Sequence, residues 1–353
     1  MNIDDLLKNQ SGWLKATGPS SDVVISSRVR LARNLVDFRF SQKLQKLKSA
    51  ELLDVVETAL SKCSYLKKGE FVQIHGLSEL DRQFLVERHL ISRELANTKS
   101  SGAVYFTDNE IISVMVLEED HLRMQTLTSG FNLTEAWRIV DQIDTELGKT
   151  LSFCFDVNLG YLTACPTNVG TGLRASCMVH LPALVMTKQV NRVLQAVSKL
   201  NMAVRGLYGE GTQAIGNFFQ FSNQVTLGHR ELDIIDNLER VVRRVLEHEK
   251  EAREALFAKK RERVDDQIWR ALGVLRTARL IPSKESTTLL SLVRLGVDMG
   301  SIPNLTTTKL NELFLQIQPA HLQKLAGKRL SQDERDIRRA ELIRGSLKDI
   351  ELN

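Results

Sequence analysis

The chain has 353 residues, a formal net charge of +5, 42% hydrophobic residues and 26% charged residues. This composition is ordinary for a globular protein of about two domains, and it excludes global disorder and collagen-like chains. No apolar run is long enough to cross a membrane, and the N-terminus has acidic residues where a signal peptide has basic ones. We therefore expect a cytoplasmic protein without membrane association. Because positive and negative charges are interspersed, direct nucleic-acid binding is not expected.

The sequence offers no metal-binding pattern. The seven histidines are scattered without an HExxH motif, and no two cysteines form a CxxC pair. An even number of cysteines does not indicate a disulfide framework in a chain of this length. The four cysteines are Cys63, Cys154, Cys165 and Cys177.

The first two-thirds of the chain mixes predicted strands and helices. Short apolar runs predict strands at 71–74, 103–107, 111–117 and 218–225. A turn at Asp108-Asn109 would join the second and third of these as an antiparallel pair. Apolar residues at helical spacing predict a helix that ends near Leu147, with Asn132 and Glu135 as a capping box at its start.

From about residue 230 onward the chain is predicted to be helical. An apolar stripe runs from 232 to 246, and 13 of the 20 residues in 247–266 are charged, which favours a solvated helix face and a domain junction. Further helices are predicted at 265–279, 283–299, 308–325 and 331–348, the last with Ser331 and Glu334 as a capping box. The expected fold class is α+β, with an antiparallel sheet and helices in residues 1–255 and an all-α domain in 256–353.

One stretch favours an anionic ligand. Residues 157–209 contain no Asp or Glu, although the chain average would place about six there. A glycine-rich turn, Cys165–Gly172, lies just before Arg174 in this stretch. Such a segment can present main-chain N–H groups and guanidinium groups to phosphate without competing carboxylates. A buried core would explain the missing acids, but it explains the turn before Arg174 less well.

Three further clusters point in the same direction. Arg28 and Arg30 alternate with apolar residues, so in a strand they would share one face. In the run EEDHLR, Glu119 lies four residues before Arg123, so a candidate base and a phosphate-binding guanidinium could meet at one strand end. The run RGLYGEGT, from 205 to 212, contains three glycines and a single carboxylate, Glu210.

Taken in order, these clusters resemble the motifs of the ATP:guanidino phosphotransferases, the phosphagen kinases. The most specific match is CPTNVGTGLR at 165–174; SSRVR at 26–30 and ERHLIS at 87–92 are others, and the resemblance covers about residues 20–250. It implies a phosphagen-kinase-like catalytic domain that uses ATP. It also implies Mg²⁺, held mostly by the nucleotide and water rather than by protein ligands.

Two differences from the phosphagen kinases indicate which branch of the family this chain resembles. Only 25 residues precede Ser26, where phosphagen kinases carry a helical domain, and a helical region follows the catalytic part instead. This arrangement resembles the bacterial protein arginine kinases, and the C-terminal RDIRRA run matches that branch. The implied function is transfer of the ATP γ-phosphate to protein arginines, which marks proteins for Clp-type proteolysis in stress response. Two alternatives stay open: a kinase for a free guanidino compound, and a non-catalytic phosphoarginine-binding adaptor.

The resemblance also implies roles for individual residues. Glu119 and Glu210 would deprotonate and hold the guanidino group, with Cys165 beside it. The implied nucleotide contacts are Ser26, Ser27, Arg28, Val29, Arg30, His89, Arg123, Arg174, Ala175, Ser176, Cys177, Met178, Arg205, Gly206, Leu207, Tyr208 and Gly209. The implied allosteric phosphoarginine site consists of Arg335, Asp336, Arg339 and Ala340. Leu117 stands where many relatives have Asn, a change expected to alter support of the loop that follows.

The same resemblance implies the partners. They are protein substrates with exposed arginines, a zinc-binding activator protein, a Clp-type unfoldase and a heat-shock repressor. A homodimer is also expected.

Overall fold

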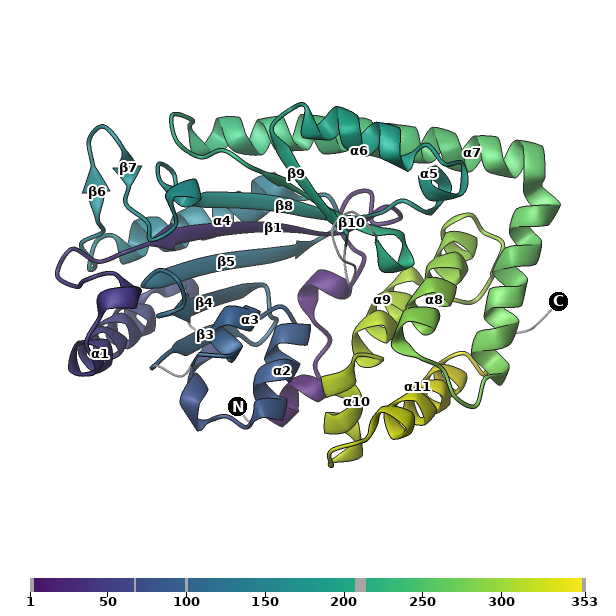
Figure 1. The fold of residues 1–353 in the computed structure, drawn as a ribbon, viewed down its shortest axis with the longest axis horizontal. Helices are drawn as coiled ribbons and strands as arrows, with labels where there is room; N and C mark the ends of the chain where they lie inside the picture. The colour runs from purple at the N-terminus through teal and green to yellow at the C-terminus, as the bar shows by residue number, and fades with distance from the viewer. Residues whose placement is uncertain (1–2, 67, 99–100, 207–213, 351–353) are drawn as a thin grey trace.

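The computed structural model describes residues 3–66, 68–98, 101–206 and 214–350 (Figure 1). These residues form an eight-stranded sheet in the order β2-β3-β4-β5-β1-β8-β10-β9, in which every neighbouring pair is antiparallel. The strands are β1 (Val24–Arg33), β2 (Gly69–Gln73), β3 (Ala103–Thr107), β4 (Ile112–Val116), β5 (Leu122–Ser129), β8 (Leu173–His180), β9 (Met202–Gly206) and β10 (Phe218–Asn223). A separate two-stranded ribbon joins β6 (Phe155–Asp156) to β7 (Gly160–Tyr161). The predicted antiparallel sheet is confirmed.

Strand β1 lies in the middle of the sheet and sets the two faces. Its side chains alternate, so Val29 and Leu31 are fully buried while Arg28 and Arg30 are only half-buried on the opposite face. The buried face packs against α4 (Leu133–Leu147), which contacts both β1 and β5. The expectation that the two arginines share a face is therefore confirmed.

Helices cover the sheet on both sides. The same core as Val29 includes side chains from α1 (Lys46–Lys62), α4, α5 (Pro182–Met186), α6 (Val190–Ser198) and the first half of α7 (Glu231–Thr277). A second core lies against the other face of β3 and β4, and it includes side chains from α2 (Glu79–Glu87) and α3 (Arg93–Ala96). The short helices α2 and α3 cover only one end of that face. The rest of the face is the surface on which the cationic side chains gather.

The C-terminal helices continue directly from the part of the chain that contains the sheet. α7 runs from Glu231 to Thr277, interrupted only by a non-helical residue, Lys260. The charged run at 247–266 is therefore the middle of one long helix, and the expected boundary at 255/256 falls inside it. Beyond α7 come α8 (Ser283–Asp298), α9 (Thr307–Gln316), α10 (Pro319–Ala326) and α11 (Gln332–Ser346), which pack back against the part that contains the sheet (Figure 1). No helix in the described ranges is long and apolar enough to span a membrane.

Two local predictions are wrong. The single helix expected at 308–325 is two helices, because Pro319 lacks an N–H and begins α10 as its first residue. Asn132 makes no side-chain cap at the start of α4, and Glu135 instead pairs with Arg138 one turn later. The capping box of Ser331 and Glu334 on α11 is confirmed in both directions.

Candidate active site

A cleft of about 950 Å³ opens on the face of the sheet that carries the arginines. Its walls come from β1, β5, β8, β9 and β10, from the turn after β4, and from the α2–α3 region. The C-terminal helices close one side of it at Gln318 and Pro319. The cleft brings together predicted residues from five separate segments of the chain, namely Arg28, Arg30, His89, Glu119, Arg123, Arg174 and Arg205.

The arginines of the cleft crowd one another, and among the described residues only Arg123 has a directly bonded carboxylate, Glu118. Arg30 lies directly opposite Arg174 in the β1–β8 ladder, where like charges repel. Burial, together with the charges of Arg123 and Arg174, lowers the pKa of Arg28 to about 10. Burial and the same neighbours, with Arg28 added, also lower the pKa of Arg30. Such an arrangement stores repulsion that a polyanion would relieve.

Unsatisfied donors in the cluster favour a ligand with oxygen acceptors. The Nε atoms of Arg30 and Arg174 are buried and have no hydrogen-bond partner in the described structure. Buried donors are otherwise nearly always paired. A di- or triphosphate has both the charge and the acceptor oxygens that these groups lack, so the residues present fit a nucleotide tail.

The acidic turn between β4 and β5 supplies two carboxylates with different roles. Arg123 donates two hydrogen bonds to Glu118, from Nη1 to Oε1 at 2.6 Å and to Oε2 at 2.8 Å. Burial opposes the charge of Glu118, but Arg123 outweighs it and holds the pKa of that carboxyl below its usual range. Glu119 and Arg123 both line the cleft at this strand end, while Glu118 is the carboxylate that bonds directly to Arg123.

Glu119 lies free at the edge of the cleft. Its side chain is exposed, and within the described residues no hydrogen bond or ion pair holds its carboxylate. Partial burial, followed by the charges of Asp120 and Glu118, raises the pKa of Glu119. An unengaged carboxylate with a raised pKa is the property required of a general base.

The turn that carries Glu119 is anchored from behind. Asp120 Oδ1 accepts hydrogen bonds from Asn34 Nδ2 at 2.7 Å and from the Ala164 N–H at 2.6 Å. Asn34 Oδ1 in turn accepts the N–H of His121. Because Ala164 immediately precedes Cys165, this bond joins the Glu119 turn to the loop of Cys165.

Leu117, at the start of this turn, has a φ of +58°. Side chains other than Asn, Asp and Gly adopt this left-handed conformation at a cost. Leu117 therefore introduces a local backbone strain at the start of the turn. The cost of this conformation is offset by the burial of Leu117, with 5% of its surface exposed, and by the hydrogen bond that its N–H donates to the His121 carbonyl.

Cys165 is half-buried, and its Sγ lies 3.0 Å from Thr167 Oγ1. A negative charge on this thiol is close enough to raise the pKa of Arg174, although burial and the neighbouring arginines lower that pKa overall. Cys165 therefore lies beside the cationic cleft.

Because side chains alternate along β1 and β8, only some of the expected nucleotide-contact residues point toward the cleft. Ser27, Val29, Ala175 and Cys177 are fully buried on the opposite face, and Ser27 Oγ bonds to the Gly130 carbonyl there. Their side chains do not reach the cleft, so a nucleotide could meet them only through main-chain atoms. Ser26 and Met178 line an adjacent slot, while Ser176 is the ladder partner of Arg28.

Part of the expected site lies outside the described residues. These are Leu207, Tyr208, Gly209 and Glu210. Arg205 and Gly206 end β9, and Arg205 is exposed at the cleft. The second carboxylate of the expected pair is therefore not placed relative to Glu119.

A small apolar slot, which sequence reasoning missed, adjoins the cleft at His89. It holds about 50 Å³, and its walls are Trp13, Leu14, Ile25, Ser26, His89, Met178, Phe218, Asn311, Phe314 and Leu315. These residues come from both ends of the chain, so no local pattern could have indicated that they meet.

The C-terminal RDIRRA run packs against neighbouring segments of the C-terminal region. Arg339 is 1% exposed, and it bonds to Asp336, to the Ile281 carbonyl and to the Ile317 carbonyl. Ala340 is equally buried. Arg335 is half-buried and donates one bond to the Leu330 carbonyl. Of the four, only Arg335 is not buried, and the Asp336 side chain keeps 11% of its surface exposed.

Within the described residues no three His, Cys, Asp or Glu side chains are grouped as metal ligands. Glu118 is engaged by Arg123, and Glu119 is the one cleft carboxylate at this turn free to approach a ligand. The cleft therefore fits a divalent cation that arrives with the phosphates better than one bound by the protein alone.

His89 makes a testable contribution to stability. Burial, with the charges of Arg28 and His321, lowers the pKa of His89 to about 3. Between that value and about 6.5 the unfolded chain binds a proton that the folded chain does not, so the unfolding free energy falls as pH drops. We expect His89→Asn, which tolerates the φ of +61° there, to recover about 1–2 kcal/mol of the stability lost between pH 7 and pH 5.

Urea denaturation at both pH values measures this effect. The control is His248→Asn, because His248 is exposed on α7 with 59% of its side-chain surface accessible. An equal loss of stability in the wild type and in His89→Asn would contradict the prediction.

Two family models match the chain. Residues 51–252 match the ATP:guanido phosphotransferase C-terminal catalytic domain, and residues 261–353 match the protein-arginine kinase McsB C-terminal domain. A duplicated taurocyamine kinase from Schistosoma mansoni with bound transition state analog components is 31% identical, with a TM-score of 0.58 over 70% of this chain and 38% of its own. Lombricine kinase, at 23% identity and a TM-score of 0.58, shares the fold. The fold and the site thus define a kinase of the guanidino phosphotransferase class.

Relatives that align with nearly the whole chain indicate the branch within this class. The protein-arginine kinase of Symbiobacterium thermophilum is 49% identical over 341 residues, which are 96% of this chain and 97% of that protein. The protein-arginine kinase of Brevibacillus brevis is 48% identical over 343 residues, 97% of this chain and 96% of its own length. The chain belongs to the ATP:guanido phosphotransferase family, in the branch formed by these protein-arginine kinases.

Proposed function

We propose that the protein transfers the γ-phosphoryl group of ATP to arginine side chains of proteins and so forms phosphoarginine. The observation that carries this proposal is the cleft in which the guanidinium groups of Arg28, Arg30, Arg174 and Arg205 gather beside an unengaged carboxylate, Glu119. The cationic side fits a nucleotide tail, and the acidic side fits a guanidinium. Similarity to protein-arginine kinases over nearly the whole chain supports protein substrates rather than a free guanidino compound.

The arginines would bind and orient the phosphates. Arg28, Arg30 and Arg174 project from adjacent strands, so their positions are held by the sheet ladder and change little on binding. Arg123 is oriented by Glu118 and adds a fourth guanidinium. Because these groups are already in place and poorly solvated, they can stabilise charge that develops during transfer without reorganising. Mg²⁺ bound to the phosphates would neutralise further charge.

Glu119 would accept the proton that makes the acceptor nucleophilic. A free guanidinium is protonated at neutral pH and its lone pairs are delocalised. As a nitrogen of the acceptor attacks phosphorus, an N–P bond forms, the bond from phosphorus to the bridging oxygen of ADP breaks, and the nitrogen proton passes to the Glu119 carboxylate. Glu210 would be the second carboxylate that holds the planar group, and a Cys165 thiolate would favour its positive charge.

Mass spectrometry tests the proposal. The protein is incubated with Mg·ATP and a mixture of arginine-containing proteins, handled without acid, and compared with an incubation that contains free arginine instead. We expect phosphoarginine on proteins and much slower turnover of free arginine. Phosphorylation of free arginine alone would support a small-molecule kinase. Nucleotide binding without any transfer would support the adaptor alternative.

The wider role follows from the branch. We propose that phosphoarginine marks substrates for a Clp-type unfoldase in stress response, that a heat-shock repressor is among the substrates, and that a zinc-binding activator assists. The resemblance to the branch supports these partners, as it supports a homodimer and a cytoplasmic location. Pull-down with a phosphorylated substrate against its unphosphorylated form tests the first of them.

We propose that the residues of the C-terminal motif have two different roles, ligand binding and support of α11. Arg335 would contact phosphoarginine, while Asp336 and Arg339 hold α11 against the carbonyls of Ile281 and Ile317. We expect Arg335→Ala to keep basal transfer and thermal stability but to lose most of the activation by added phosphoarginine, measured as initial rate against its concentration. Arg338→Ala, on the exposed side of the same helix, is the control. Full activation of Arg335→Ala would contradict the assignment.

A further inference from the structure

The apolar slot next to the cleft is built from three distant parts of the chain. Trp13 and Leu14 come from the N-terminal segment, Ser26 and Phe218 from the sheet, and Phe314 with its neighbours from α9. His89 borders both the slot and the cationic cleft, so the two spaces adjoin. A ligand whose anionic part is bound by the arginines can therefore place an apolar part in the adjoining slot.

The walls of the slot are aromatic and held in contact. The Trp13 and His89 rings lie edge to face with centroids 5.2 Å apart, and the Phe218 and Phe314 rings do the same at 4.9 Å. The Nε1 of Trp13 is buried and has no hydrogen-bond partner in the described structure. The 50 Å³ of the slot is room for the edge of a planar ring rather than for a sugar or a phosphate.

The α9 wall is fixed to the N-terminal wall by several bonds. Asn311 Nδ2 donates to the Leu14 carbonyl at 3.1 Å, and Thr308 Oγ1 donates to the Lys15 carbonyl at 2.9 Å. Arg294 of α8 donates to Asn311 Oδ1 and, at 2.7 Å, to the Ser21 carbonyl. The slot therefore has its present shape only when the C-terminal helices are docked.

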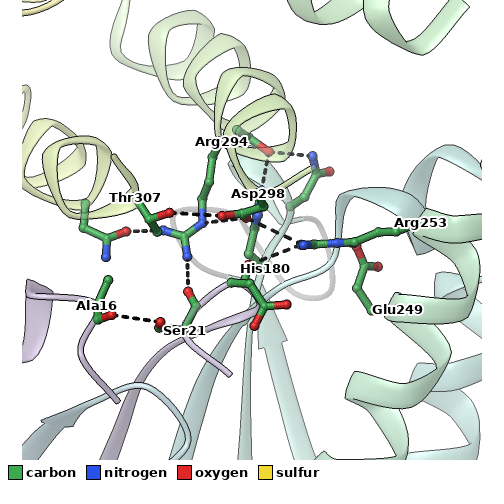
Figure 2. A network of polar contacts seen from close by, with 12 residues as sticks. Ala16, Ser21, His180, Glu249, Arg253, Arg294, Asp298 and Thr307 are labelled. Carbon is green, nitrogen blue, oxygen red and sulfur yellow. Dashed lines mark hydrogen bonds and ion pairs between the residues drawn. The ribbon is translucent and has the colours of Figure 1, made fainter. Parts of the chain in front are cut away.

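Figure 2 shows the buried network that holds Arg294 in this position. Asp298 lies between Arg294 and Arg253, with 3.7 Å to each guanidinium, and Thr307 at the start of α9 donates to its other oxygen at 3.1 Å. Arg253 also pairs with Glu249 of α7 at 2.9 Å. This network links α7, α8 and α9 to the N-terminal segment behind the slot.

We propose that the helical C-terminal region completes the base-binding part of the nucleotide site, with Phe314 and Leu315 opposite Trp13 holding one edge of the purine. This inference rests on the proposed function, because it requires that the cationic cleft bind the phosphates of a nucleotide. It assigns part of the specificity for the base to α9, outside the sheet-containing part of the chain. It also makes nucleotide affinity depend on the docking of α9.

A comparison of ligands with and without a base tests the proposal. Calorimetry measures binding of Mg·ADP and of inorganic pyrophosphate to the full chain, so that no transfer occurs. We expect Phe314→Leu to raise the dissociation constant for Mg·ADP about three- to tenfold, since one aromatic contact is lost, and to leave that for pyrophosphate unchanged. Trp13→Phe, from the opposite wall, should act in the same direction.

The matched control is Phe257→Leu, because Phe257 is a partly buried aromatic residue of α7 outside the slot. It should change neither dissociation constant, and thermal melting checks that every variant is folded. Unchanged Mg·ADP affinity in both slot variants would overturn the proposal, as would an equal loss for pyrophosphate. Failure of the wild type to bind Mg·ADP at all would instead refute the proposed function.

Discussion

Glu119→Gln is expected to lower the rate constant of phosphoryl transfer by about 10²–10⁴-fold while the affinity for Mg·ADP changes less than about twofold. The amide has nearly the same shape as the carboxylate but cannot accept the proton of the guanidino group. Among the described residues, Glu119 forms no hydrogen bond or ion pair with the arginines assigned to phosphate binding, so nucleotide binding should survive its loss. Single-turnover kinetics with a protein substrate measures transfer, and calorimetry measures binding.

Glu118→Gln is the informative comparison. Glu118 is paired with Arg123, and its side chain is only 2% exposed, so its loss removes the contact that orients Arg123 toward the phosphates. We expect this variant to weaken nucleotide binding, unlike Glu119→Gln. If Glu119→Gln kept transfer and lost nucleotide affinity, the roles assigned to the two carboxylates would be reversed.

The raised pKa of Glu119 also has a kinetic consequence. The base acts only when ionised, so the rate falls as pH drops through its pKa. Because Asp120 and Glu118 add to the effect of burial, this fall should begin at a higher pH than for an ordinary glutamate. A pH profile that stays flat down to the usual carboxyl range would show that another group accepts the proton.

Asp144→Asn is expected to destabilise the fold by about 3–5 kcal/mol. Asp144 on α4 accepts two bonds from Arg33, to Oδ1 from Nε at 3.0 Å and to Oδ2 from Nη2 at 2.8 Å. Arg33 is 1% exposed, and the variant would leave its charge buried without a counter-ion. The same arginine donates to the Thr171 carbonyl, so the turn before Arg174 should loosen as well.

Urea denaturation measures the loss, and a second pair on the same helix supplies the control. Glu135 and Arg138 of α4 form an exposed ion pair, which water already screens, so Glu135→Gln should change stability little. Comparable losses in the two variants would mean that burial does not decide the strength of these pairs.

Much of the site could be predicted because its residues lie in compact runs. Arg28 and Arg30 share a face through strand alternation alone, and SSRVR, EEDHLR and CPTNVGTGLR each mark one wall of the cleft. The partner of Arg123 could not be predicted, because Glu118 and Glu119 are adjacent in sequence and only the turn decides which one points back. The break within 308–325 was predictable from Pro319, which has no N–H to donate within a helix. The helical spacing of the apolar residues continues across Pro319 and favoured a single helix.

The base slot and the buried network behind it were beyond prediction. Trp13 and Phe314 stand some three hundred residues apart, and neither belongs to a motif. Arg294 and Arg339 resemble solvent-facing helix residues in the sequence, yet both are almost fully buried. Burial of a charge depends on partners that pack from other elements, which local pattern does not contain.

The sequence by itself determined the fold class and the cationic character of the cleft, because charge, glycine placement and strand alternation act over a few neighbouring residues, and its motifs carried the resemblance to the family. The tertiary structure alone decided which carboxylate stays free, which arginines are structural, and how the C-terminal helices close on the site. Those outcomes depend on contacts between distant segments, whose energies come from packing and desolvation rather than from the order of residues along the chain.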